Sequence, residues 1–423
     1  MRKLFIQLSA ALIASASVMA VTAANAAELK AGDVISAANY DQVKNDTFEG
    51  HKISDLITDK VGILITKFGL KMTLRNSEKI AIPTKEDIAN TAKYSKDVKI
   101  DPTTHEVTGY IAGRPFPDLS IDDPLAGYKA LWNKYYQDTY GLTFSGHYSF
   151  LFINVKTGLD RVQRWYNTSF KMKGRQTGDP VLGTDNLVKK QILFAVEPYD
   201  IRGIGVFTLR YDSPKLEDNW AYVKSVRRTR QLSGSSWMDN LAGSVQLNDE
   251  YDGFSGRPSW YPAAKLVEKR WILAVAHLPK ILVNSSASDN ASKYPTLDLA
   301  TSPYCWPTSA VGWEPREVWK IEVTMPPEHP YSKRVYYEEV QFPRIYQMEH
   351  YDKSGEFAKN SFVFSTPRIG GDGIVAMLPD QGTAFDIKRE AAWVYLGEPD
   401  NTPDDPKITE NDVTLGKLAA GGN

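Results

Sequence analysis

Apolar residues along this chain follow two periods, three to four residues near the front and two over most of the remainder. Across residues 53–68 the apolar positions recur at steps of three and four, so one helix with a single apolar stripe is expected, ended by Gly69. A second helix is expected to begin at Asp122, Asp123 and Pro124, an acidic cap followed by proline, and to continue through Tyr135. Both helices need a surface to pack against.

The period of two predicts a series of strands after Gly146. Each run is rich in β-branched and aromatic residues and is bounded by Gly, Pro, Asp or Asn; the runs are 147–155, 162–172, 191–196, 203–211, 220–232, 265–275, 317–325 and 333–351. Short turns between consecutive runs indicate antiparallel pairing. Trp319, Ile321 and Val323 alternate with polar residues, as expected for a sheet with one buried and one wet face.

The same pattern suggests how the chain is organised. Residues 27–423 are expected to form a single domain, with a helix-containing N-terminal part at 27–145 and an antiparallel sheet at 146–400. Residues 283–315 are rich in Ser, Asn, Pro and Thr and interrupt the strands as a long excursion. Residues 401–423 are expected to be a polar tail.

The first 26 residues have the pattern of a secretory signal peptide. A basic start at Arg2 and Lys3 precedes an apolar run, and Ala24, Asn25 and Ala26 give the small-x-small cleavage pattern. No cysteine follows the apolar run, so we expect a protein that is secreted without lipidation into the periplasm. No later apolar run approaches the roughly 20 residues that a membrane span needs.

Composition narrows the function classes further. Removing Arg2 and Lys3 leaves 48 basic side chains against 51 acidic ones, a balance that argues against nucleic acid as a partner. Cys305 is the single cysteine, so an intramolecular disulfide and cysteine metal clusters are excluded. Aromatic residues are abundant, with 10 Trp, 22 Tyr and 16 Phe.

Several short segments, in order, resemble a proteobacterial family of uncharacterised proteins called domain of unknown function 1329. They are Gly-Tyr-Ile-Ala-Gly-Arg-Pro-Phe-Pro at 109–117, Asp-Asn-Trp-Ala-Tyr at 218–222 running into 226–230, Asp249 with Phe-Ser-Gly at 254–256, His-Pro-Tyr-Ser-Lys-Arg-Val at 329–335, and 351–355. Lys224 departs from the family's usual proline, and the excursion around Cys305 matches no family motif.

The resemblance implies a fold similar to the lipoprotein carriers LolA and LolB. That fold is mainly β with helices, and its strongly curved antiparallel sheet forms an incomplete barrel closed by N-terminal helices. We therefore expect the helix at 53–68 on the concave side. Members of the family are often encoded near exporters of the resistance-nodulation-division type and an outer-membrane protein, so the implied partners are an inner-membrane exporter, an outer-membrane protein and a hydrophobic, lipid-like molecule.

Seven large apolar or aromatic residues are candidates for contacting such a ligand: Leu64, Phe68, Phe116, Trp132, Trp220, Tyr222 and Trp319. An apolar cavity suits an acyl chain because burying each methylene contributes about 0.8 kcal/mol. The tryptophans among them are more often core residues than ligand contacts, because large aromatic residues usually dominate protein cores.

A basic cluster at Arg227, Arg228 and Arg230 has two interpretations. Guanidinium groups bind carboxylates and phosphates bidentately, so the cluster could dock an acidic partner. Alternatively, Arg228 or Arg230 forms an internal ion pair with Asp218 or Asp249. We favour the structural interpretation, because successive strand residues point to opposite faces and cannot form one patch.

Catalytic patterns are weak throughout the chain. Ser255 lies in a Gly-x-Ser-x-x context, but a nucleophile elbow needs glycine where Arg257 stands. The six histidines show no metal-ligand spacing, and residues 248–253 resemble a calcium loop whose twelfth position is Ser259 instead of glutamate. No cofactor, metal or catalytic group is therefore expected. The main alternatives to a carrier are a carbohydrate-binding or carbohydrate-modifying protein, and a structural scaffold whose barrel is filled.

Overall fold

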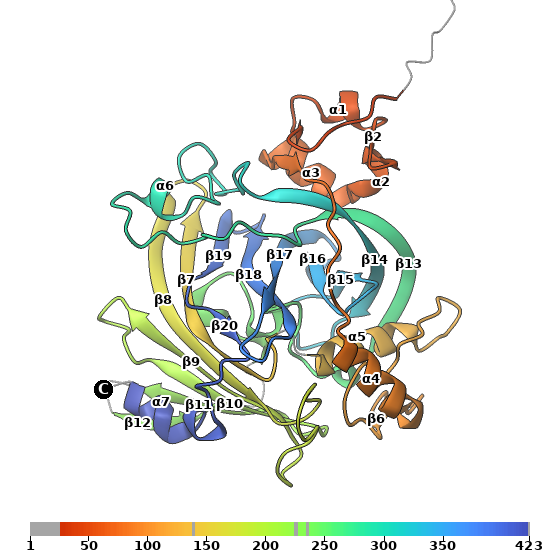
Figure 1. The fold of residues 1–423 in the computed structure, drawn as a ribbon. Coiled ribbons are helices and arrows are strands. Elements are labelled where there is room, and N and C mark those ends of the chain that lie inside the picture. The colour runs from red at the N-terminus through yellow and green to blue at the C-terminus, as the bar shows by residue number, and fades with distance from the viewer. Residues whose placement is uncertain (1–25, 138–139, 224–226, 234–236, 422–423) are drawn as a thin grey trace, which may run out of the picture.

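One large curved sheet organises the chain (Figure 1). The computed structural model describes residues 26–137, 140–223, 227–233 and 237–421. The predicted signal peptide therefore lies almost wholly outside the described residues. Among those residues, no helix is both long and apolar enough to cross a bilayer.

The sheet contains sixteen strands, in the order β1-β4-β14-β15-β16-β17-β18-β19-β7-β8-β9-β10-β11-β12, with β13 beside β14 and β20 beside β7. All pairings are antiparallel except that of β4 with β14. The long strands are β7 (Thr143–Asn154), β8 (Gly158–Lys171), β9 (Leu187–Glu197), β10 (Gly205–Tyr211), β11 (Asp218–Val223), β12 (Arg228–Gln231), β13 (Ala263–Ala274), β14 (Gly312–Thr324), β15 (Lys333–Glu339), β16 (Ile345–Tyr351), β17 (Phe357–Ile369), β18 (Val375–Asp386) and β19 (Ala391–Gly397).

Short elements complete the fold. The short strands of the sheet are β1 (Val34–Ile35), β4 (Met72–Leu74) and β20 (Thr402–Pro403). The helices are α1 (Tyr40–Val43), α2 (Ile53–Leu56), α3 (Asp59–Phe68), α4 (Lys85–Tyr94), α5 (Ala126–Tyr136), α6 (Asn290–Lys293) and α7 (Leu415–Gly421). Two minor hairpins pair β2 (Thr47–Phe48) with β3 (His51–Lys52) and β5 (Lys99–Ile100) with β6 (Val107–Thr108).

The predicted mainly β fold with a curved, open antiparallel sheet is confirmed. In this strand order β12 stands at one end and β1 at the other. Among the described residues, β12 pairs with β11 and not with β1 or β4, so the sheet does not close into a barrel. Every predicted run contains a strand. The runs 220–232 and 333–351 each hold two strands, because the chain reverses within them: Trp220 pairs with Gln231, and Lys333 with Tyr351.

The concave side of the sheet is occupied by part of the segment between β12 and β13. Residues 232–233 and 237–262 of that segment are described, and residues 237–262 are here called the inserted segment. Phe254 packs on Tyr336 of β15 with ring centroids 5.7 Å apart, and Tyr251 on Tyr395 of β19 at 5.4 Å. Figure 1 shows this green segment inside the curve of the strands. Helix α5 packs on the same face, where the Tyr128 hydroxyl donates to the carbonyl of Tyr261 at 2.9 Å.

Helices α2 and α3 pack on the opposite face of the sheet. The ring of Phe68 lies 5.3 Å from that of Phe385, and Trp313 lies 5.3 Å from Phe362. Successive residues of β17 point to opposite faces of the sheet. Phe362 lies in the core under α3, whereas Val363 lies in the core formed by the inserted segment and α5. The prediction that the helix at 53–68 covers the concave side is therefore wrong, because the inserted segment already fills that side.

Local capping explains two further differences from the expected helices. The stretch 53–68 forms α2 and α3, separated by extended backbone at Ile57 and Thr58, and the Thr58 hydroxyl accepts a hydrogen bond from the amide of Val61. Helix α5 begins at Ala126, after the expected proline at position 124. Asp123 still acts at this end, since its carboxylate accepts from the amide of Leu125 at 2.9 Å.

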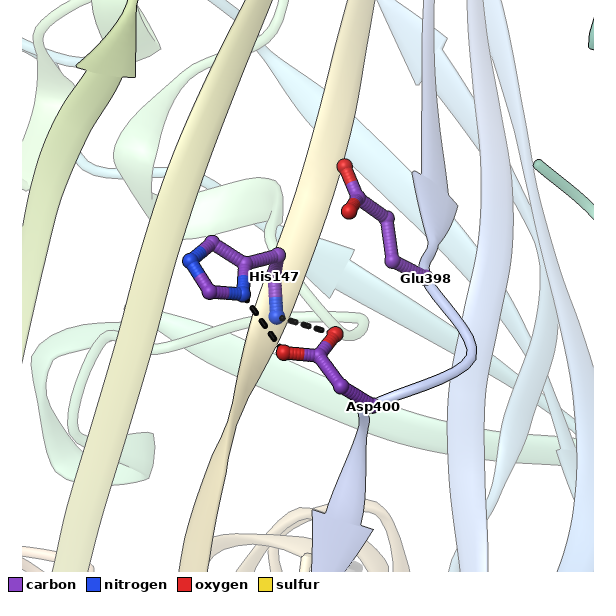
Figure 2. Close-up of side chains that lie close together, drawn as sticks. All are labelled: His147, Glu398 and Asp400. Atoms are coloured by element: carbon purple, nitrogen blue, oxygen red, sulfur yellow. Dashed lines mark hydrogen bonds and ion pairs between the residues drawn. The ribbon is translucent and has the colours of Figure 1, made fainter. Parts of the chain in front are cut away.

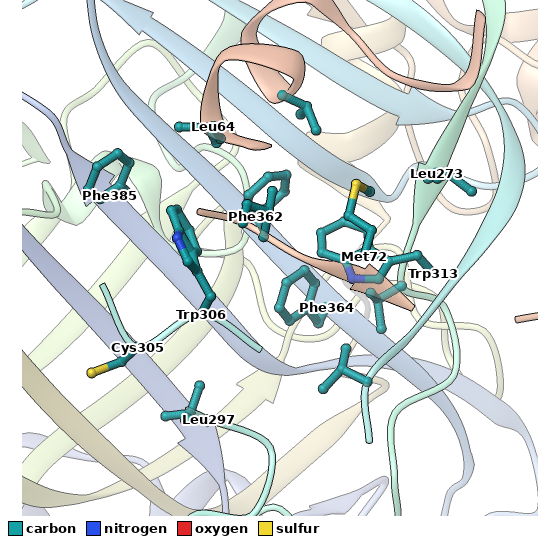
Figure 3. Close-up of a cluster of buried hydrophobic side chains, with 14 of the residues drawn as sticks. Leu64, Met72, Leu273, Leu297, Cys305, Trp306, Trp313, Phe362, Phe364 and Phe385 are labelled. Atoms are coloured by element: carbon teal, nitrogen blue, oxygen red, sulfur yellow. The ribbon is translucent and has the colours of Figure 1, made fainter. Parts of the chain in front are cut away.

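The excursion at 283–315 forms a cover on the face that carries α3 (Figure 3). Leu297, Cys305 and Trp306 are buried there, and the indole of Trp306 donates to the carbonyl of Phe68 at 2.7 Å. The expected polar tail is wrong in part: Val413 and Leu418 are fully buried, and α7 packs on β9, β10 and β11. Its apolar residues Leu415, Leu418 and Ala419 are three and four positions apart, the spacing of one helix face, so a short helical signal was present in the sequence.

Candidate ligand cavity

A cavity of about 190 Å³ lies on the concave face, at the end of the sheet formed by β8 to β11. The inserted segment, α5 and Tyr140 close it from the other side. Strand alternation places the lining residues of β8 to β11 on one face, because Leu193 pairs with both Asn167 and Val206.

Apolar and aromatic side chains form most of the wall. They are Tyr135, Tyr140, Phe150, Val188, Leu193, Val206, Leu232, Trp237, Leu241, Tyr251 and Phe254. Burial raises the pKa of Tyr135, Tyr140 and Tyr251, so these phenols stay neutral. The Tyr140 hydroxyl donates to that of Tyr251 at 2.9 Å. The wall is therefore mostly apolar, and its tyrosines add neutral hydrogen-bonding groups.

Four uncharged polar side chains on four adjacent strands cross the sheet side of the cavity, and we call them the polar row: Asn167, Gln191, Thr208 and Asn219. Register places them side by side, since Thr208 pairs with both Gln191 and Asn219. The Gln191 amide donates to Asn167 Oδ1 at 2.9 Å, and the Thr208 hydroxyl donates to Asn219 Oδ1 at 2.6 Å.

Four charged residues of the lining form ion pairs with one another. Arg210 Nε lies 2.5 Å from Glu217 Oε1, and Lys134 Nζ lies 3.0 Å from Asp252 Oδ2. Asp252 also forms an ion pair with Arg344. Lys189 makes an interaction within the chain as well. The charges of Arg210, Glu217, Lys134 and Asp252 are therefore compensated within the lining.

Three carboxylates of the inserted segment fasten it to the sheet, and we call this group the anchor. Asp249 pairs with Arg334 of β15, Glu250 Oε1 with Lys359 Nζ of β17 at 2.6 Å, and Asp252 with Arg344. All three cations are fully buried. The stretch that resembles a calcium loop therefore directs its carboxylates to protein cations, as expected of a structural turn.

The seven predicted ligand contacts lie in three separate cores. Leu64 and Phe68 pack in the core under α3; Phe116, Trp132 and Trp319 pack around α5; Trp220 and Tyr222 pack under α7. None of the seven lines the cavity. They are large apolar residues on the predicted elements, and the structure uses them to join those elements. Their role as ligand contacts stays a prediction.

The predicted ion pairs of the basic cluster are wrong in their partners. Asp249 pairs with Arg334, and Asp218 Oδ2 lies 2.6 Å from Lys215 Nζ. Arg227, Arg228 and Arg230 are exposed, and among the described residues none of them meets either carboxylate. The reason is topological, because the inserted segment carries Asp249 away from β12 and onto β15. The docking interpretation of the arginines stays a prediction.

A group of side chains that could hold a metal ion lies beside β7. Figure 2 shows its members, His147, Glu398 and Asp400. His147 Nδ1 lies 2.6 Å from Asp400 Oδ2. Glu398 accepts from Arg164 Nε at 2.9 Å and from the Ser149 hydroxyl at 3.1 Å. A metal ion would have to compete with this arginine for Glu398, so the group functions as an ion-pair cluster that joins β7, β8 and the chain after β19.

The cavity lining offers little for catalysis. Ser255 borders the cavity, but its hydroxyl donates to the carbonyl of Asn248 at 3.3 Å, and no histidine or cysteine is among the described residues of the lining. Burial lowers the pKa of His329 to about 2, and the nearby Arg334 adds to this shift. A smaller cavity of about 50 Å³ lies apart, bordered by Asp87, Arg114 and Asp404 among others.

Comparison with known families now adds to this geometry. A family model described as "Protein of unknown function (DUF1329)" matches residues 34–409. The chain belongs to this family. The family match confirms the resemblance seen in the motifs, and it covers the whole sheet together with α3 and α5.

Solved structures give weaker similarity. A DUF1329 family protein from Desulfovibrio piger is 15% identical, with a TM-score of 0.48, and the match covers 70% of this chain and 99% of that one. A LolA superfamily protein from Nitrosomonas europaea is 15% identical, with a TM-score of 0.40, and the match covers 69% and 98%. No curated protein matches the chain.

Sequence reasoning missed the residues that line the cavity. A usable signal exists in β9 and β10, where Gln191 and Leu193, or Val206 and Thr208, occupy positions two apart and therefore share one face. The position of the inserted segment has no such signal, because it depends on contacts with strands that follow it in the chain.

Proposed function

We propose that this protein is a periplasmic, non-enzymatic carrier that binds a hydrophobic, lipid-like molecule and passes it between partners in the cell envelope. The observation that carries the proposal is the cavity between β8 to β11 and the inserted segment, with its mostly aromatic and aliphatic wall. Burying an alkyl chain there contributes about 0.8 kcal/mol per methylene, and such a function needs no catalytic group.

The cellular setting of the proposal comes from the sequence. The signal-peptide pattern at residues 1–26 supports the periplasm as the location. An exporter of the inner membrane and an outer-membrane protein are the proposed partners. The exposed Arg228 and Arg230 at the sheet edge offer guanidinium groups to an acidic surface of either partner.

A chain-length series tests the proposal. Purified protein without residues 1–26 is titrated with amphiphiles that share a head group and differ in length, by displacement of a fluorescent fatty-acid analogue. Each added methylene should tighten binding by up to about fourfold until the cavity is full. Trp237 lines the cavity, so the loss of the emission change in Trp237→Phe would place the ligand there.

A cavity-filling variant provides the matched comparison. Val206→Phe places a larger side chain in the cavity, whereas Ile204→Phe adds the same ring at a position 40% exposed and outside the lining. Val206→Phe should weaken binding at least about tenfold, and Ile204→Phe should leave it unchanged. Affinity independent of chain length, together with a tryptophan response to soluble oligosaccharides, would instead establish the carbohydrate-binding alternative.

A further inference from the structure

The polar row is an unusual feature for a cavity that would bind only hydrocarbon. Four uncharged hydrogen-bonding side chains lie next to one another across β8, β9, β10 and β11, and they face the aromatic residues of the inserted segment. Asn167 is only 2% exposed. Buried polar groups that lose water need partners, so a ligand without polar atoms would leave part of this row poorly satisfied.

The chemistry of the row suits a particular kind of partner. Each side-chain amide carries two N–H donors and one carbonyl acceptor, and the bond from Gln191 to Asn167 uses one donor of the first and the acceptor of the second. Gln191 therefore keeps its acceptor, and Asn167 keeps its donors. A hydroxyl, ester or amide can use donors or acceptors of this kind, whereas a carboxylate can only accept.

The charged residues nearby favour an uncharged head group further. Arg210 follows Thr208 on β10, and its Nε forms an ion pair with Glu217 Oε1 at 2.5 Å. The guanidinium carbon of Arg210 also lies 5.3 Å from the centroid of the Tyr135 ring. Lys134 is held by Asp252. An anionic head would lose its hydration inside the cavity and would have to compete with these carboxylates for a cation.

We propose that the cavity selects amphiphiles with an uncharged hydrogen-bonding head, such as a fatty alcohol, a monoacylglycerol or a fatty amide, and discriminates against fatty acids and phospholipids. The head binds at the polar row, and the apolar part lies against Trp237, Phe254 and Leu193. This inference rests on the proposed carrier function, and it names the class of ligand.

A head-group series at constant chain length tests the selectivity. Lauramide, monolauroylglycerol, laurate and lauroyl lysophosphatidylglycerol are compared at pH 8 by displacement of one uncharged fluorescent probe. We expect the two uncharged ligands to bind at least about tenfold more tightly than the two anions. Equal or tighter binding of laurate would overturn the inference while leaving the carrier function intact. Failure of all four ligands to bind would overturn the carrier function itself.

Variants of the polar row and its neighbour sharpen the test. Thr208→Val keeps the side-chain shape and should reduce the preference for lauramide over laurate by about 2- to 10-fold, the worth of one hydrogen bond. Thr229→Val on β12, whose side chain faces the other side of the sheet, is the matched control and should change nothing. Glu217→Gln removes the carboxylate from Arg210 and should tighten laurate binding about threefold or more. An unchanged preference in both Thr208→Val and Glu217→Gln would overturn the assignment.

Discussion

The two ends of the concave face differ in what the inserted segment does there. At β15 to β17 it places carboxylates directly against buried cations, and these pairs form the anchor. At β8 to β11 the same segment presents Trp237 and Phe254 to the sheet and leaves the cavity. One segment is thus fixed to the sheet at one end and leaves space at the other, so the cavity depends on that fixed position.

The difference has a physical basis in charge. Buried ions must be paired at close range, so the anchor has little freedom to shift. The polar row and the aromatic wall are neutral, and neutral groups can exchange water for a ligand at modest cost. The comparison predicts that substitutions at the anchor change stability strongly, whereas substitutions at the polar row change binding more than stability.

The largest effect is expected from Arg334→Met. Removing the guanidinium leaves Asp249 buried without its cation, which should lower the free energy of unfolding by about 3–5 kcal/mol. Urea unfolding followed by tryptophan emission measures this. Lys333→Met on the same strand is the control, because its pair with Glu322 is at the surface and worth less than about 1 kcal/mol. Equal effects of the two variants would contradict the anchor.

A pH-dependent effect is expected at Glu338, which lies on the concave side of β15 near the anchor. Burial raises the pKa of Glu338 to about 8, although Lys134 and Arg114 oppose the shift. Because the folded protein keeps this proton while the unfolded chain ionises near 4.5, stability falls as pH rises from about 4.5 to about 8.

Glu338→Gln should remove this loss. The variant should gain about 4 kcal/mol over the parent at pH 8 relative to their difference at pH 4.5, measured by urea unfolding at both values. Glu322→Gln, on a partly exposed position of β14, is the matched control. A constant difference between variant and parent across the pH range would show that Glu338 is ionised in the folded protein.

The smallest effect on stability is expected from Thr208→Val in the polar row. Its hydroxyl bonds to Asn219 at the cavity surface, and the exchange should lower the free energy of unfolding by about 1 kcal/mol or less. Thermal unfolding without ligand measures this. A loss comparable to that of Arg334→Met would mean that the polar row is structural in the same way as the anchor, and the contrast between the two ends would fail.

Part of the anchor could be found from the sequence. The family motifs single out Asp249 and the segment at 329–335, and these contain both members of the pair between Asp249 and Arg334. The pairing itself could not be predicted, since 85 residues separate the two. The motif around Arg228 and Arg230 suggested one of these arginines as the partner of Asp249. That prediction is wrong, because the fold brings Arg334 of β15 against the inserted segment.

The sequence by itself determined the strands, the antiparallel pairing of neighbours and the family, because alternation and short turns are local properties of the chain. Only the tertiary structure decided which face each element covers. The inserted segment took the concave side, α3 and the excursion took the other, and Trp220 and Tyr222 were covered by α7. Face selection depends on which apolar surfaces meet across hundreds of residues, and no local pattern records that choice.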